Sequence, residues 1–240
     1  MTFPMTFSQA PDAFTYADLP ALMAIMTGDE KHSPSANSTL DALWVLYDRV
    51  LRIDPIDPDA PHRDRFLLSK GHGPMAYYAV LAAKGFIDPE VLATFAAYDS
   101  PLGNHPDRLL VPGVEISSGS LGHGLPIAVG VALGLDTTGP PDARVFCLVG
   151  DGELDEGSNH EAIAFAGRIG LERLTTIVID NRSATHGWPG GIARRFDVEE
   201  WWTAAVDARD HDALERALTT PHPGQPGVVV AVVGYEGGLR

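Results

Sequence analysis

The chain has 240 residues, enough for one α/β domain with a sizeable core but too few for two large catalytic domains. It carries 32 acidic against 17 basic residues, a formal net charge of −15, which argues against nucleic acid and anionic membranes as partners. The single cysteine excludes an internal disulfide, and no apolar run is long enough for a signal peptide or a membrane span. We therefore expect a cytoplasmic protein.

The first half of the chain is predicted to be mainly helical. Its apolar residues recur at helical spacing, and proline and glycine bracket one of the segments, as is typical of helix starts and ends. After a polar lead-in over residues 1–20, the predicted elements are a helix after Pro20, a helix over 39–53, a strand over 65–69, a helix from Pro74 to Gly85 and a helix over 88–98 with Asp88 near its cap.

The second half alternates continuous apolar runs with helical segments. The predicted elements are a small-residue helix within 119–136, a strand over 144–149, a helix over 156–168, a strand over 174–180 and a strand over 227–235. Runs that are apolar on both faces and flank a helix indicate parallel strands. The sequence therefore predicts one α/β domain with a doubly wound parallel sheet and helices on both faces, and residues 182–202 remain undecided between loop and helix.

Polar residues follow two of the predicted strands at their carboxyl ends. Gly150, Asp151 and Gly152 end the strand over 144–149, and Asn181 ends the next strand. Ligands of open parallel sheets collect at this edge, and one carboxylate with one amide oxygen suits Mg²⁺ that keeps positions for phosphate and water. The glycines allow a ligand to approach the main chain, and the following helix points N–H groups at an anion. This arrangement predicts a magnesium–diphosphate site in a surface crevice.

Four motifs, in the same order, resemble the thiamine diphosphate-binding domain of the transketolase family. They are LSKGHGPMAYYAVLAAKGF at 68–86, HPD at 105–107, GVEISSGSLGHG at 113–124, and GDGELDEGSNHEA at 150–162 with IVIDN ending at Asn181. The resemblance covers residues 21–187, so the whole chain is expected to be a single diphosphate-binding domain with a shortened part over 188–240. It implies thiamine diphosphate and Mg²⁺ as cofactors.

The resemblance also implies roles for particular residues. Asp151, Asn181 and the carbonyl of Ser183 would bind the metal. His32, His72 and His105 would serve as catalytic histidines. The residues implied to contact the cofactor are His72, Gly119, Leu121, Gly150, Asp151, Gly152, Glu153 and Asn181, and those implied at a subunit interface are Glu156 and Glu161.

Other histidines and the cysteine have simpler interpretations. His62, His211 and His222 lie in polar turns and are expected to be solvated, and Cys147 in the middle of a strand is expected to be a buried, inert thiol. His186 stands where the family usually has an acidic residue, and it receives no role.

Two departures from the family bear on the substrate. Asn104 replaces the glycine before His105, and the sequence ends at Gly-Gly-Leu-Arg where the family continues into a segment with one more active-site histidine. The resemblance implies a partner subunit that carries the pyrimidine-binding domain and its catalytic glutamate, in an α₂β₂ assembly.

Three functions remain open at this point. The first is transfer of a two-carbon ketol unit between sugars or other small carbonyl compounds. The second is an acyloin-forming or decarboxylating thiamine diphosphate ligase acting on a 2-oxo acid. The third is a non-catalytic scaffold or regulatory subunit of the same fold, against which the intact pair Asp151 and Asn181 argues.

Overall fold

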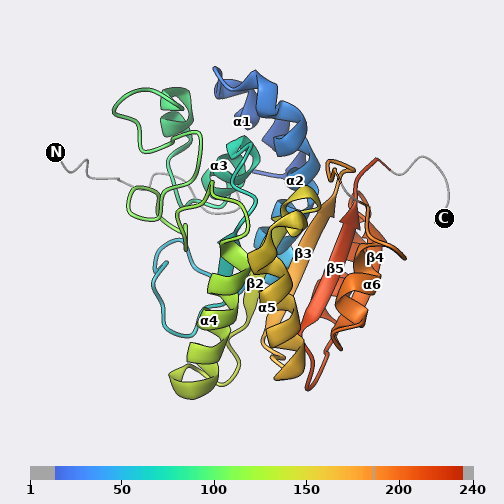
Figure 1. Cartoon of the computed structure of the whole chain (residues 1–240). Helices are drawn as coiled ribbons and strands as arrows, with labels where there is room; N and C mark the ends of the chain where they lie inside the picture. Colours follow the sequence, from blue (N-terminus) through green and yellow to red (C-terminus); the bar gives the residue numbers. More distant parts are fainter. Residues whose placement is uncertain (1–13, 186, 235–240) are drawn as a thin grey trace.

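Five parallel strands form one sheet at the centre of the molecule. The computed structural model describes residues 14–185 and 187–234. The sheet order is β1-β2-β3-β5-β4, and all neighbouring strands are parallel (Figure 1). The strands are β1 (Arg65–Leu68), β2 (Val145–Gly150), β3 (Leu174–Asp180), β4 (Trp202–Asp207) and β5 (Gly227–Val232).

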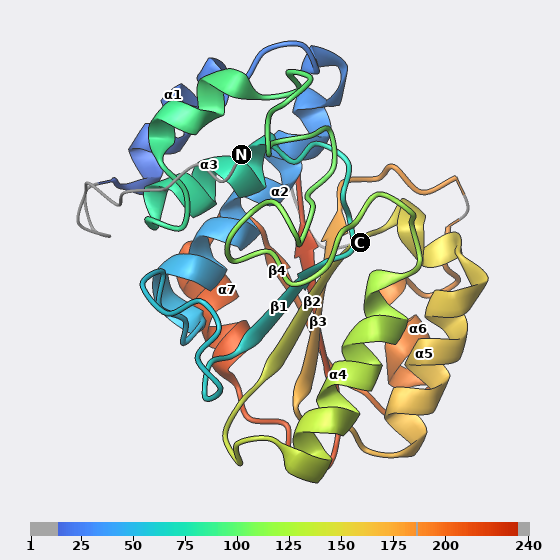
Figure 2. The same ribbon diagram turned by 90° about the vertical axis from the view of Figure 1, so that its left-hand side faces the viewer.

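Helices cover both faces of this sheet, as predicted. Figure 2 shows α4, α5 and α6 on one side of the sheet and α2 and α7 on the other. The helices are α1 (Leu19–Ile25), α2 (Ser33–Val45), α3 (Met75–Ala83), α4 (Gly124–Thr138), α5 (Gly157–Arg168), α6 (Ile192–Asp197) and α7 (His211–Thr219).

Alternate residues of each central strand enter two separate cores. In β2, Phe146 and Leu148 pack with α1, α2 and α3, whereas Cys147 and Val149 pack with α4 and α5. Both sets are fully buried, which explains why the strand has a continuous apolar sequence. Cys147 is a buried thiol whose pKa is raised by burial, in agreement with the expectation that it is inert.

Several element boundaries differ from the predictions. The helix after Pro20 ends at Ile25, because Met26 is extended and Gly28 adopts a positive φ of 102°. The helix expected over 39–53 begins earlier, as α2, and continues as a π-helical turn over Leu46–Val50.

The helix expected over 88–98 is a short 3₁₀ helix over Pro89–Thr94. Asp88 does cap it, by accepting a hydrogen bond from the Glu90 N–H at 2.9 Å. The helix ends because Ala96 adopts a φ of 59° and donates its N–H to the carbonyl of Leu102 at 2.8 Å.

The undecided segment 182–202 contains the short helix α6, and two later elements were not predicted. β4 is an edge strand whose residues are half-buried or exposed, and α7 follows it with an Asp210 cap that accepts from the Ala213 N–H at 2.9 Å. None of the residues of β4 is fully buried, unlike those of the other edge strand, β1, so β4 lacks an apolar run that the sequence pattern would reveal. Within the described residues, none of the helices is both long and apolar enough to traverse a lipid bilayer.

Candidate functional site

The carboxyl ends of β1, β2 and β3 place three polar segments next to one another. Because these strands are neighbours in the sheet, the residues that follow them meet at one edge. The long loop between α3 and α4 crosses the same edge (Figure 2). The sequence therefore folds its Gly-His-Gly, Gly-Asp-Gly and Asn181 motifs into one region.

Asp151 is buried, with only 1 % of its surface exposed. This corrects the prediction that it lies in a surface crevice. The loop after β3 folds over its carboxylate. Oδ1 accepts hydrogen bonds from the Gly152 N–H at 2.8 Å and the Ser183 hydroxyl at 2.5 Å. Oδ2 accepts from the N–H groups of Ser183 at 2.8 Å and Ala184 at 3.2 Å. Asp151 thus joins the ends of β2 and β3.

Asn181 faces the same point as Asp151. Its Oδ1 accepts from the Ser183 N–H at 3.2 Å, the same group that bonds to Asp151, while its Nδ2 donates to the hydroxyl of Ser38 at 3.1 Å. The Ser183 carbonyl lies against Gly152, 3.5 Å from the position that a Cβ would occupy there. A carboxylate, an amide oxygen and a carbonyl oxygen are hard ligands, so these residues fit Mg²⁺. Among the described residues, no group of three His, Cys, Asp or Glu side chains could hold a metal, so the amide and carbonyl oxygens are needed here.

Glu153 links three segments of the site. Its Oε1 accepts from the Ser69 hydroxyl and from the Gly122 N–H at 2.9 Å, and its Oε2 accepts from the Gly150 N–H at 3.1 Å. Burial raises the pKa of this carboxyl, although the hydrogen bonds oppose the shift. Glu153 therefore holds the glycine-rich loop against the ends of β1 and β2, and its predicted contact with a cofactor stays a prediction.

Lys70 lies within the first of the four motifs, and only the structure shows its place in the site. Its ammonium donates to the Ser35 carbonyl at 2.9 Å, to the Ser35 hydroxyl at 2.6 Å and to the Thr39 hydroxyl at 2.9 Å. Its side chain lies 3.2 Å from where a Cβ on Gly150 would be. Burial lowers the pKa of Lys70 to about 8, despite the nearby carboxylates of Glu153 and Asp151. The sequence did contain a signal for this role, because Lys70 directly follows the apolar run over 65–69.

Three histidines from distant parts of the chain meet at this edge. The ring centroids of His32 and His72 are 5.8 Å apart, and those of His72 and His105 are 5.0 Å apart, each pair edge to face. Burial lowers the pKa of His72, and the neighbouring His105 and His32 lower it further. The structure thus brings the three predicted catalytic histidines together, and their roles in a reaction stay predictions.

Glycines allow the loops of the site to pack without side chains between them. Gly119 has a φ of 129°, and a Cβ there would lie 2.7 Å from the His105 ring. A Cβ on Gly71 would lie 2.6 Å from the Gly119 nitrogen. Leu121 is half-buried in the same loop. The glycine-rich loop therefore rests directly on the Gly-His-Gly segment.

Other residues singled out in the sequence lie outside this cluster. Glu156 and Glu161 are exposed at the start of α5 and along it, and His62 is exposed as predicted. His211 and His222 are not simply solvated, which corrects the prediction. His211 pairs with Asp41 at 2.7 Å, and His222 stacks on Trp202 with ring centroids 5.7 Å apart. His186 lies outside the described residues.

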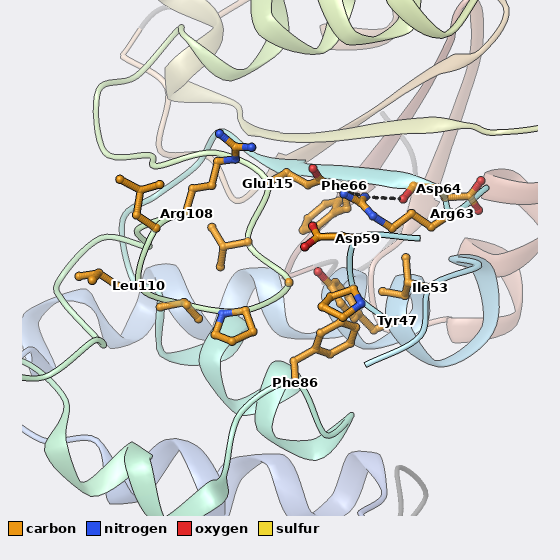
Figure 3. A pocket seen from close by; sticks show the side chains of 16 residues that line it. Tyr47, Ile53, Asp59, Arg63, Asp64, Phe66, Phe86, Arg108, Leu110 and Glu115 are labelled. Atoms are coloured by element: carbon orange, nitrogen blue, oxygen red, sulfur yellow. Dashed lines mark hydrogen bonds and ion pairs between the residues drawn. The ribbon is translucent and has the colours of Figure 1, made fainter. Parts of the chain in front are cut away.

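A separate cavity of about 480 Å³ lies between the 51–64 segment and the loop over 108–115. Figure 3 shows Tyr47, Phe66 and Phe86 along it. Its lining includes none of the predicted site residues, and its Arg63 is ion-paired with Glu115. The cavity is therefore not part of the candidate site.

Comparisons with known proteins agree with the geometry. The family model described as "Transketolase, thiamine diphosphate binding domain" matches residues 16–236. A protein of Rhodococcoides fascians named "Ferredoxin fas2" is 59 % identical over 225 residues, which cover 94 % of this chain and 74 % of that protein. A protein of Actinobacillus succinogenes, named as one subunit of an apulose-4-phosphate transketolase, is 37 % identical over 83 % of this chain and 75 % of its own length.

Solved structures give the same result. A crystal structure of a transketolase from Pichia stipitis superposes with a TM-score of 0.74 and 25 % sequence identity. The superposition covers 91 % of this chain and 36 % of that one, so this chain spans about a third of the length of that transketolase.

Proposed function

The chain belongs to the transketolase family, as its thiamine diphosphate-binding domain, and from this premise we propose that it is one subunit of a two-component enzyme that transfers a two-carbon ketol unit between small carbonyl substrates. The observation that carries the proposal is the convergence of Asp151 and Asn181 at adjacent strand ends, in the region where three histidine rings meet. Family membership alone leaves substrate and partner open, since folds host several reactions.

The chain's own residues would hold the cofactor and its metal. Asp151, Asn181 and the Ser183 carbonyl would bind Mg²⁺, and the backbone of Gly150 and Gly152 would face the diphosphate. Gly119 and Leu121 lie in the same loop, and they would contact the aminopyrimidine ring of the cofactor. When bound, thiamine diphosphate supplies a nucleophilic carbon and an electron sink for cleaving a carbon–carbon bond beside a carbonyl.

The histidines would move protons on the substrate. With its pKa lowered, His72 is neutral at pH 7 and can accept or donate a hydrogen bond. His32 and His105 would contact the hydroxyls and the carbonyl oxygen of the ketose, where proton transfer is needed as a bond breaks.

His72→Ala is expected to weaken cofactor binding or to lower kcat by about a hundredfold or more, the usual loss for a positioned acid–base group. The matched control is His62→Ala, because His62 is exposed and lies outside this cluster. His222 is unsuitable as a control because it is hydrogen-bonded to Thr175 and stacked on Trp202. Calorimetry and steady-state kinetics measure the two effects, and equal losses in both variants would contradict this assignment.

Lys70 is expected to make the stability of the cofactor-free chain depend on pH. Its folded-state pKa of about 8 lies below the ordinary 10.5, so between these values the unfolded chain binds more protons than the folded chain. Stability therefore rises from about pH 8 to about pH 10, by up to about 3 kcal/mol. Lys70→Met should lack this gain. Urea unfolding of both proteins at several pH values measures it, and parallel pH profiles would contradict it.

An exposed apolar surface over α4 and α5 is the proposed contact with further subunits. Ile127 on α4 and Phe165 on α5 are 44 % and 48 % exposed. Added Cβ atoms on Gly130 and Gly134 would meet nothing within 4 Å, so another backbone can approach α4 closely. Together with the exposed Glu156 and Glu161, this surface supports the α₂β₂ assembly.

The names of two relatives bear on the substrate and the chemistry. One relative is named for a phosphorylated sugar, apulose 4-phosphate, which supports a sugar-type donor here as well. The other relative is named a ferredoxin, but this chain does not have the cysteines for an iron–sulfur cluster. Such clusters are generally held by four cysteines, and this chain has one, which is buried in β2.

The experiment that tests the function uses this chain mixed with its partner subunit, thiamine diphosphate and Mg²⁺. A ketose phosphate and pyruvate are compared as donors by steady-state kinetics. Turnover of the ketose phosphate supports ketol transfer, and turnover of pyruvate alone would favour the 2-oxo acid ligase. If calorimetry detects no thiamine diphosphate binding in the presence of Mg²⁺, the non-catalytic alternative is favoured.

A further inference from the structure

Asp29 is a buried carboxylate beside the three histidines that none of the roles above uses. It precedes the helical turn that leads into α2, and its surface is 4 % exposed. Its Oδ1 lies 2.6 Å from Nδ1 of His32, while its Oδ2 is buried and has no hydrogen-bond partner among the described residues. A buried oxygen without a partner costs free energy, so packing alone does not explain an aspartate at this position.

The backbone around His32 is fixed as well. The His32 N–H donates to the Asp29 carbonyl at 2.9 Å. The His32 carbonyl lies 3.0 Å from where a Cβ on Gly73 would be, so the turn packs directly on the Gly-His-Gly segment. The ring of His32 therefore has little freedom other than rotation about its side-chain bonds, and the bond to Asp29 restrains that rotation.

The bond also determines which ring nitrogen carries the proton. A carboxylate accepts hydrogen bonds, so Nδ1 must be the protonated nitrogen of a neutral His32. Nε2 is then the nitrogen with the lone pair, and it has no hydrogen-bond partner in the part of the chain that the structure describes. The His32 ring meets the His72 ring edge to face, so this imidazole belongs to the histidine cluster.

We propose that Asp29 is a positioning residue that holds His32 in the Nδ1–H tautomer, so that Nε2 can accept a proton from a hydroxyl of the ketose substrate. The substrate step rests on the proposed function, whereas the tautomer does not. The adjacent carbon–carbon bond of the ketose would break, with its electron pair passing to the electron sink that bound thiamine diphosphate supplies. As this bond breaks, the hydroxyl proton moves to Nε2, the hydroxyl oxygen becomes a carbonyl, and Asp29 stabilises the resulting imidazolium without taking the proton.

The test is Asp29→Asn in the ¹⁵N-labelled full chain. The imidazole nitrogen shifts of His32, identified by their loss in His32→Gln, report the tautomer without cofactor or partner. We expect the Nδ1–H form in the natural chain and the Nε2–H form in Asp29→Asn, because the new amide can donate to Nδ1. In the assembled enzyme, kcat should fall by about tenfold to a hundredfold, with thiamine diphosphate affinity unchanged.

Asp41→Asn is the matched control, because Asp41 forms the chain's other described Asp–His pair, with His211 at 2.7 Å, towards the opposite end of α2. It should leave the His32 signals and kcat unchanged. An unchanged His32 tautomer in Asp29→Asn, or an unchanged kcat in an active assembly, overturns the proposal. If the natural assembly transfers no ketol unit, the proposed function fails, and the tautomer measurement alone decides whether Asp29 positions His32. If Asp29→Asn folds poorly, the same ¹⁵N measurement of the His32 tautomer is made on Asp29→Ala.

Discussion

Asp151→Ala is expected to abolish the magnesium-dependent binding of thiamine diphosphate. Removing the carboxylate deletes the charged ligand of the proposed metal site, and an amide and a carbonyl oxygen alone bind Mg²⁺ weakly. Calorimetric titration of thiamine diphosphate, with and without Mg²⁺, measures the loss. Binding with an unchanged dependence on Mg²⁺ would show that the metal lies elsewhere.

A second variant separates metal binding from folding. Because Asp151 accepts hydrogen bonds from Gly152, Ser183 and Ala184, alanine also removes partly buried hydrogen bonds, at a cost of about 1 kcal/mol each. Asp151→Asn keeps one oxygen and the size of the side chain while removing the charge. Asp155→Asn, on an exposed side chain in the next turn, is the matched control. Loss of binding in Asp151→Asn, with an unfolding midpoint near that of the natural chain, assigns the effect to the metal site.

The 240-residue chain is expected to be inactive in ketol transfer when it is purified alone. The resemblance to transketolases implies that a glutamate on a pyrimidine-binding domain activates the aminopyrimidine ring of the cofactor, and the described residues form one five-stranded sheet. The chain spans about a third of a solved transketolase, 36 % of its length. The missing contacts would come from the proposed partner subunit.

Donor cleavage by the purified chain, with saturating thiamine diphosphate and Mg²⁺, measures this. Activity that appears only when the partner is added supports a two-component enzyme, and full activity of the chain alone contradicts it. A variant of the proposed contact surface tests the partner requirement further. Phe165→Asp, on the exposed surface of α5, should reduce activation by the partner and leave the affinity for thiamine diphosphate unchanged. If the variant instead weakens thiamine diphosphate binding, Phe165 supports the structure of the cofactor site and not the contact with the partner.

Much of the fold follows from local sequence patterns. The central strands β2, β3 and β5 are continuous apolar runs because helices cover both of their faces, and such runs are visible without any contact information. β4 has no such run, because its residues are half-buried or exposed, whereas the other edge strand, β1, keeps a buried apolar run. The spacing over 88–98 predicts a longer helix than the structure has, because its end depends on a hydrogen bond from Ala96 to Leu102 that apolar periodicity does not encode.

The candidate site divides in the same way between local pattern and long-range packing. Asp151 and Asn181 can be placed together from the amino-acid sequence, because residues that end neighbouring parallel strands must lie at one edge of the sheet. The burial of Asp151 under the loop after β3, the burial of Lys70 against α2 and the pairing of Asp29 with His32 are visible only in the folded chain. The first two contacts join segments far apart in the sequence, whereas Asp29 and His32 are three residues apart and are brought together by the helical turn between them. Burial then lowers the pKa of Lys70. Short-range spacing specifies which side chains reach the edge of the sheet, whereas the surrounding packing specifies their charge and their orientation.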